Sequence, residues 1–98
     1  MLRDEIIATL KREEPHLRAR GVTRLALFGS VVRGEERPDS DVDLLIDVDP
    51  SVKFSLLDRA GVINRLEDAL GRSVEVCRRE MLKPLLRDRI LSEAMDVF

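Results

Sequence analysis

The sequence predicts a single α+β domain in which a small mixed β-sheet carries helices on one face. Two observations lead to this fold class. A chain of 98 residues, 44 % of them hydrophobic, can bury one core but not two, so residues 1–98 are expected to form one domain. Apolar residues recur at helical and at strand spacing, in the order helix, strand, strand, helix, strand, helix.

The N-terminal part of the chain begins with a helical pattern. Apolar residues at helical spacing favour a helix over residues 2–10. Pro15 interrupts the pattern and either kinks this helix or opens a second short turn that ends at Gly21. Residues 22–28 are typical of a strand, and the polar residues 29–40 follow it as a turn, a short helix and a loop.

The C-terminal part predicts a strand, a helix, a strand and a helix, over residues 41–48, 56–70, 73–77 and 84–90. Ser55 and Asp58 have the spacing of a capping box at the start of the first of these helices, and Gly71 is placed to end it. The tail, residues 94–98, fits either a strand or a docked coil.

Composition excludes several classes of protein. The balance of 17 basic and 19 acidic residues is nearly neutral, and the only aromatic residues are three phenylalanines, which disfavours direct sequence-specific binding of nucleic acid. One cysteine cannot build a disulfide framework or a zinc cage. No apolar run approaches about 18 residues, and there is no secretory signal, so we expect no membrane partner and a cytoplasmic location.

A phosphate-binding turn is predicted directly after the first strand, in the segment FGSVVRG. A chain that turns from a strand into a short helix directs backbone N–H groups outward, where they can bind phosphate. Gly29 lets the backbone approach a ligand closely, and Ser30 adds a hydroxyl. Arg33, one turn further on, can reach the same anion with its planar guanidinium group.

Acidic residues alternate with apolar residues on the two following strands. Asp41 and Asp43 fall on one face of their strand, whereas the intervening apolar positions face the core. Glu75 has the same position on the third strand, so it completes a group of three carboxylates if the two strands are neighbours. Such oxygen ligands suit Mg²⁺, and carboxylates beside a phosphate-binding turn are typical of two-metal phosphoryl or nucleotidyl transfer.

These residues resemble a known family. Gly29-Ser30, ten further residues and Asp41-Val42-Asp43 resemble the Gly-Ser-x10-Asp-x-Asp signature of the polymerase-β-like nucleotidyltransferases. The segments FGSVVRG and SDVDLLI are similar to the minimal nucleotidyltransferases, the antitoxin half of two-gene modules whose other half is a HEPN-domain ribonuclease. The resemblance extends from the first helix to Glu75 and implies a polymerase-β-like nucleotidyltransferase core.

The resemblance also implies an activity and a set of site residues. It implies an enzyme that transfers AMP from ATP to a hydroxyl, that of a tyrosine, on a HEPN-domain toxin, which silences the toxin. Asp41 and Asp43 would bind two Mg²⁺ ions, and Glu75 would be the third metal ligand and help to activate the acceptor hydroxyl. The nucleotide would be bound by residues at the Gly-Ser turn and before the second strand, namely Gly29, Ser30, Arg33 and Ser40.

The chain departs from the family in two ways. Many members carry aspartate where this chain has Glu75. We also expect no counterpart of the helical domain with which larger relatives hold their acceptors, so acceptor recognition is expected to come from the partner. Two other functions therefore stay open: a non-catalytic antitoxin that masks its toxin sterically, and nucleotidyl transfer to a small molecule. Either a homo-oligomer or a hetero-oligomer is compatible with the sequence.

Overall fold

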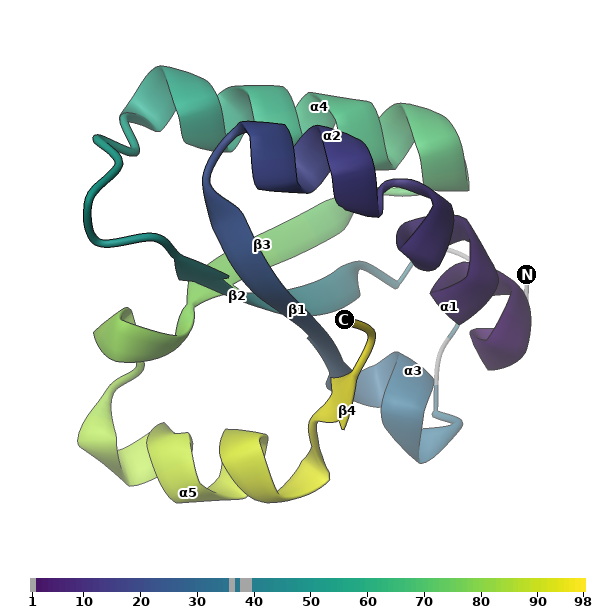
Figure 1. The fold of residues 1–98 in the computed structure, drawn as a ribbon. Coiled ribbons are helices and arrows are strands. Elements are labelled where there is room, and N and C mark those ends of the chain that lie inside the picture. The colour runs from purple at the N-terminus through teal and green to yellow at the C-terminus, as the bar shows by residue number, and fades with distance from the viewer. Residues whose placement is uncertain (1, 36, 38–39) are drawn as a thin grey trace.

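The computed structural model describes residues 2–35, 37 and 40–98 and confirms the α+β class. The elements in chain order are α1 (Arg3–Arg12), α2 (Glu14–Ala19), β1 (Val22–Phe28), α3 (Ser30–Arg33), β2 (Val42–Val48), α4 (Leu56–Leu70), β3 (Val74–Arg78), the 3-10 helix η1 (Arg79–Met81), α5 (Pro84–Glu93) and β4 (Met95–Asp96). Figure 1 shows how the helices lie above and below the sheet.

The four strands form one mixed sheet in the order β3-β2-β1-β4. β1 runs antiparallel to both β2 and β4, whereas β2 and β3 are parallel. A parallel pair needs a crossover connection, and α4 provides it. This crossover makes the second and third predicted strands neighbours, which is the condition for their acidic residues to meet.

The larger part of the core lies on the face of the sheet that α1, α2 and α4 cover (Figure 1). The three helices contribute Ile6, Leu10, Leu17, Val62, Leu66 and Leu70 to this core. As predicted, the alternate positions Val42, Leu44 and Ile46 of β2 point into it and are fully buried. The capping box between Ser55 and Asp58 is also present at the start of α4.

The prediction that the helices lie on one face is wrong for α5. The other face carries Ala26, Phe28 and Leu45, which are buried. Side chains of α5, among them Ile90 and Leu91, pack against these three residues. The physical reason is the alternation of the strands, because apolar residues on both faces of the two central strands require cover on both sides.

The C-terminal tail combines the two predicted alternatives. Met95 and Asp96 pair with β1 as strand β4, and the last two residues continue as a docked segment. The Val97 amide donates to the Leu25 carbonyl over 2.8 Å, and the Leu25 amide donates to the Phe98 carbonyl over 3.1 Å. Within the residues that the structure describes, no helix has the length and apolar character needed to cross a membrane.

Candidate functional site

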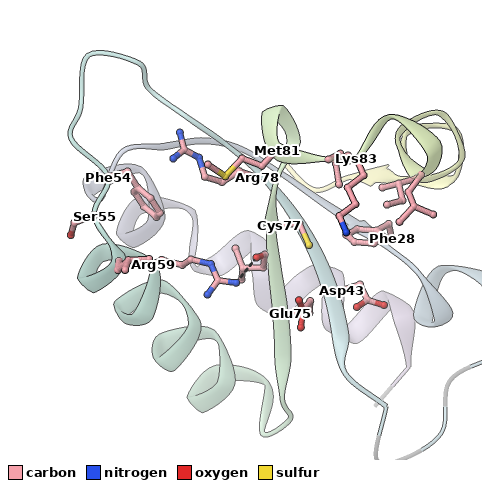
Figure 2. A pocket seen from close by; sticks show the side chains of 15 residues that line it. Phe28, Asp43, Phe54, Ser55, Arg59, Glu75, Cys77, Arg78, Met81 and Lys83 are labelled. Atoms are coloured by element: carbon pink, nitrogen blue, oxygen red, sulfur yellow. Dashed lines mark hydrogen bonds between the residues drawn. The ribbon is translucent and has the colours of Figure 1, made fainter.

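Two of the predicted acidic residues meet on neighbouring strands. Asp43 and Glu75 are register partners in the parallel pair of β2 and β3, so their side chains leave the same face of the sheet. Figure 2 shows the two carboxylates beside one another. Phe28, the last residue of β1, is the partner of Asp43 on its other side. The pair therefore lies where β1 turns into α3.

The third acidic residue, Asp41, lies one residue before β2 and is exposed. Its charge still reaches Asp43. Burial raises the pKa of the Asp43 carboxyl above its usual value, and the charges of Glu75 and Asp41 raise it further, whereas Arg33 lowers it. The structure thus places Asp43 and Glu75 side by side, and the exposed Asp41 acts on Asp43 through its charge; we call these three residues the acidic cluster (Asp41, Asp43 and Glu75).

The turn from β1 into α3 lies against the acidic cluster. Gly29 has φ +80° and ψ −152°, a conformation that is essentially restricted to glycine. A Cβ atom at this position would lie 2.1 Å from Oδ2 of Asp43, so the turn and the carboxylate are in direct contact. We call residues 29–33 the Gly29 turn.

Arg33, the cation of the Gly29 turn, forms ion pairs with two glutamates. Arg33 Nε donates to Glu35 over 3.0 Å, and Arg33 Nη1 donates to both carboxylate oxygens of Glu93, each over 3.1 Å. The Gly29 amide donates to Glu93 Oε1 over 3.2 Å. The main-chain and side-chain donors that the sequence assigned to phosphate therefore bind a carboxylate in this structure.

The two predicted serines have different positions. Ser30 is the first residue of α3, next to Gly29. Ser40 organises the loop before β2: its hydroxyl accepts from the Arg37 amide over 2.9 Å, and its carbonyl accepts from Arg72 Nη2 over 2.8 Å. Ser40 thus has a structural function in the loop that leads to the acidic cluster.

A cavity of about 670 Å³ opens beside Asp43 and Glu75. Its walls come from β3, the start of α4, the segment 81–83 and α5 and are largely apolar, with Phe28, Phe54, Leu82, Leu86 and Ile90 among the lining residues. Arg59, Arg78 and Lys83 supply positive charge. The volume is in the range of small-molecule and nucleotide sites, so the acidic pair lies at the edge of a cavity that could hold a substrate.

The donor set of the acidic cluster fits Mg²⁺, which prefers carboxylate oxygens. A divalent cation would also relieve the repulsion that raises the pKa of Asp43. Across residues 2–35, 37 and 40–98, however, no three His, Cys, Asp or Glu side chains are already grouped as a metal site. The three carboxylates would have to turn toward a shared cation.

Glu93 is the residue at this site that sequence reasoning missed. It ends α5 and is separated from Gly29 by 64 positions. Within its helix it is one of several charged residues, and no local pattern distinguishes it. The signal that could have indicated it is indirect: if the tail pairs with β1, the residue just before the tail must lie near the end of β1.

Comparison with known proteins assigns the chain to a family. The family model described as "Nucleotidyltransferase domain" matches residues 3–97. A protein adenylyltransferase of Thermococcus cleftensis is 37 % identical over 95 residues, which are 96 % of this chain and 94 % of the relative. A Methanocaldococcus jannaschii protein, provisionally named a protein adenylyltransferase, is 42 % identical over 83 residues, which are 85 % of this chain and 87 % of the relative.

Solved structures share the fold. A provisionally named minimal nucleotidyltransferase superposes with a TM-score of 0.82 at 36 % identity, covering 97 % of this chain and 95 % of its own. A toxin–antitoxin structure with AMP-PNP has a TM-score of 0.71 at 18 % identity, covering 90 % and 72 %. A complex of tri-AMPylated Shewanella oneidensis HEPN toxin with its MNT antitoxin has a TM-score of 0.63 at 15 % identity, covering 90 % and 68 %.

At such low identity the last two structures demonstrate the common fold alone. The family match over nearly the whole chain and the two relatives above 35 % identity are stronger, and they agree with the Gly-Ser and Asp-x-Asp residues that the structure brings together. The chain is therefore a member of the nucleotidyltransferase domain family and, within it, one of the minimal nucleotidyltransferases.

Proposed function

We propose that this chain is an antitoxin that transfers AMP from ATP to a hydroxyl, that of a tyrosine, on a HEPN-type toxin. The observation that carries the proposal is the register of Asp43 and Glu75 on β2 and β3, with the Gly29 turn in contact with Asp43. Carboxylates that can hold divalent cations, beside backbone and side-chain donors that can bind phosphate, suit two-metal nucleotidyl transfer.

The chemistry assigns a task to each side chain. Asp41 and Asp43 would hold two Mg²⁺ ions, and Glu75 would be the third ligand and help to accept the proton of the attacking hydroxyl. Bound Mg²⁺ would supply charge neutralisation of the triphosphate and a lower pKa for the acceptor. Gly29, Ser30, Arg33 and Ser40 would hold the nucleotide. The acceptor oxygen bonds to the α-phosphorus, the bond from that phosphorus to the β-phosphate oxygen breaks, and pyrophosphate leaves.

The acceptor and the partner are inferred from the relatives. The names of two relatives describe protein adenylyltransferases, and one structure of the same fold pairs an MNT antitoxin with an AMPylated HEPN toxin. The apolar cavity beside Asp43 and Glu75 supports an aromatic acceptor or the base of the nucleotide as its occupant, because both are flat and largely apolar.

Transfer of label from ATP tests the proposal. The protein, its cognate HEPN-type partner, Mg²⁺ and ATP labelled at the α-phosphate should give a labelled partner. Asp41→Asn and Asp43→Asn should each reduce the labelling at least a hundredfold, because each removes a charge from the metal ligands. Asp68→Asn is the matched control, since Asp68 is an exposed aspartate of α4 outside the site. This control should label the partner as the unmodified protein does.

Neutralisation of the toxin separates the alternatives. If the Asp41/Asp43 double variant still binds the partner and still neutralises it, the chain acts by steric masking rather than by AMP transfer. Turnover of labelled ATP with an aminoglycoside-type hydroxyl compound, in the absence of any protein partner, would instead favour transfer to a small molecule.

A further inference from the structure

A carboxylate of the chain itself lies on the anion-binding donors of the Gly29 turn. Glu93 Oε1 accepts from the Gly29 amide over 3.2 Å, and both of its carboxylate oxygens accept from Arg33 Nη1 over 3.1 Å. The Glu93 side chain is only 19 % exposed. One acidic group thus occupies at once the backbone donor and the side-chain donor that a phosphate would use.

The backbone that presents Glu93 is anchored. Immediately after it, Met95 and Asp96 pair with Leu27 and Ala26 of β1, and the following Val97 is buried. Because β1 itself leads into Gly29, the same strand positions the donors and the carboxylate that binds them. Rotation about the side-chain bonds of Glu93 can nevertheless free the donors without breaking the β4 pairing.

The charges at the site oppose the simultaneous presence of Glu93 and a phosphate. Glu93 lies near enough to the acidic cluster to raise the pKa of Asp43, whereas Arg33 lowers it. Arg33 is the cation whose charge acts on both Asp43 and Glu93, and it already forms an ion pair with Glu93. A carboxylate that served only to orient Arg33 would leave the Gly29 amide open, but Glu93 uses that amide as well.

We propose that Glu93 is an internal competitor of the nucleotide: it occupies the Gly29 amide and Arg33 in the free protein, and a phosphate group of the nucleotide must displace it. This inference rests on the proposed function, because it takes the Gly29 turn as the phosphate site. Glu93 then sets the affinity for ATP without being part of the reacting groups.

Binding of ATP to Glu93→Gln tests the proposal. Glutamine keeps the shape and an acceptor oxygen but loses the charge, so it competes less well with phosphate for Arg33. Titration calorimetry with ATP and Mg²⁺ should give a Kd about fivefold to tenfold lower than that of the unmodified protein. Glu35→Gln is the matched control. Glu35 also pairs with Arg33, but its side chain is 66 % exposed and accepts from Arg33 Nε rather than from Nη1. The Kd of this control should change less than twofold.

The outcomes distinguish this inference from the proposed function. If the unmodified protein binds ATP and Glu93→Gln binds it equally or more weakly, Glu93 does not compete and the inference is wrong, while the proposed function stands. If neither protein binds ATP, both are wrong.

A second measurement needs no variant. Tripolyphosphate, added with Mg²⁺ to protein labelled with ¹³C, should shift the side-chain carboxyl resonance of Glu93 and the amide resonance of Gly29 with the same midpoint. A shift of Gly29 without any change at Glu93 would overturn the competition.

Discussion

Replacement of Gly29 by alanine should damage both the fold and the site. At φ +80° and ψ −152° a residue with a Cβ atom is strained by about 1 to 3 kcal/mol. The added Cβ would also lie 2.1 Å from Oδ2, 2.9 Å from Cγ and 3.1 Å from Cβ of Asp43. The whole Asp43 side chain, and not its tip alone, must therefore move.

The matched control is Gly34→Ala, at the other end of α3. Gly34 has φ +72°, but nothing lies within 4 Å of a Cβ atom built there. Its cost is the left-handed backbone alone, about 1 kcal/mol. We expect Gly29→Ala to lose at least about 2 kcal/mol, because its backbone strain and the displacement of Asp43 add.

Thermal unfolding followed by circular dichroism measures the two costs. With about 4 to 8 °C per kcal/mol for a domain of this size, Gly34→Ala should melt roughly 5 °C lower and Gly29→Ala roughly 10 to 20 °C lower than the unmodified protein. At a temperature where both are folded, Gly29→Ala should transfer no label from ATP and Gly34→Ala should remain active. Equal melting temperatures, or an active Gly29→Ala, would refute the argument from the contact with Asp43.

Three further predictions concern charge and packing. Asp43→Asn should be more stable than the unmodified protein at pH 7, because the raised pKa of Asp43 means that its negative charge is unfavourable in the folded state. In urea unfolding, the gain in unfolding free energy should shrink as the pH falls through the raised pKa, and it should vanish below the ordinary value of 3.8. Glu75→Gln should accelerate alkylation of Cys77 at pH 8. Burial is the main cause of the raised pKa of this thiol and the charge of Glu75 is the next, so removing that charge should lower the pKa and increase the thiolate fraction. An unchanged rate would mean that the two side chains do not interact. Leu66→Ala, at a fully buried position of α4, should cost about 3 to 5 kcal/mol in urea unfolding, whereas Leu57→Ala, at a side chain that is 83 % exposed, should cost less than about 0.5 kcal/mol.

Local patterns were enough to predict most of the helices and strands and the residues of β2 that face α1, α2 and α4, but not the 3-10 helix η1. The alternation of apolar and acidic residues from Asp41 onward predicted which residues of β2 point into the larger core, and Val42 and Leu44 lie there as expected. Turn chemistry was equally informative: the Ser55 capping box begins α4, and Gly71 ends it in the left-handed conformation. These features depend on neighbours within about one helical turn or two strand residues, so the sequence alone contains their cause.

The tertiary structure decided which of these residues meet. The pairing of Asp43 with Glu75 depends on β3 lying beside β2, and the contact of Glu93 with Gly29 depends on β4 lying beside β1. The cover that α5 gives to the second face of the sheet depends on the same strand order. Strand order is a property of the whole chain, because it is set by which long-range pairings bury the most apolar surface, and no local pattern records that competition.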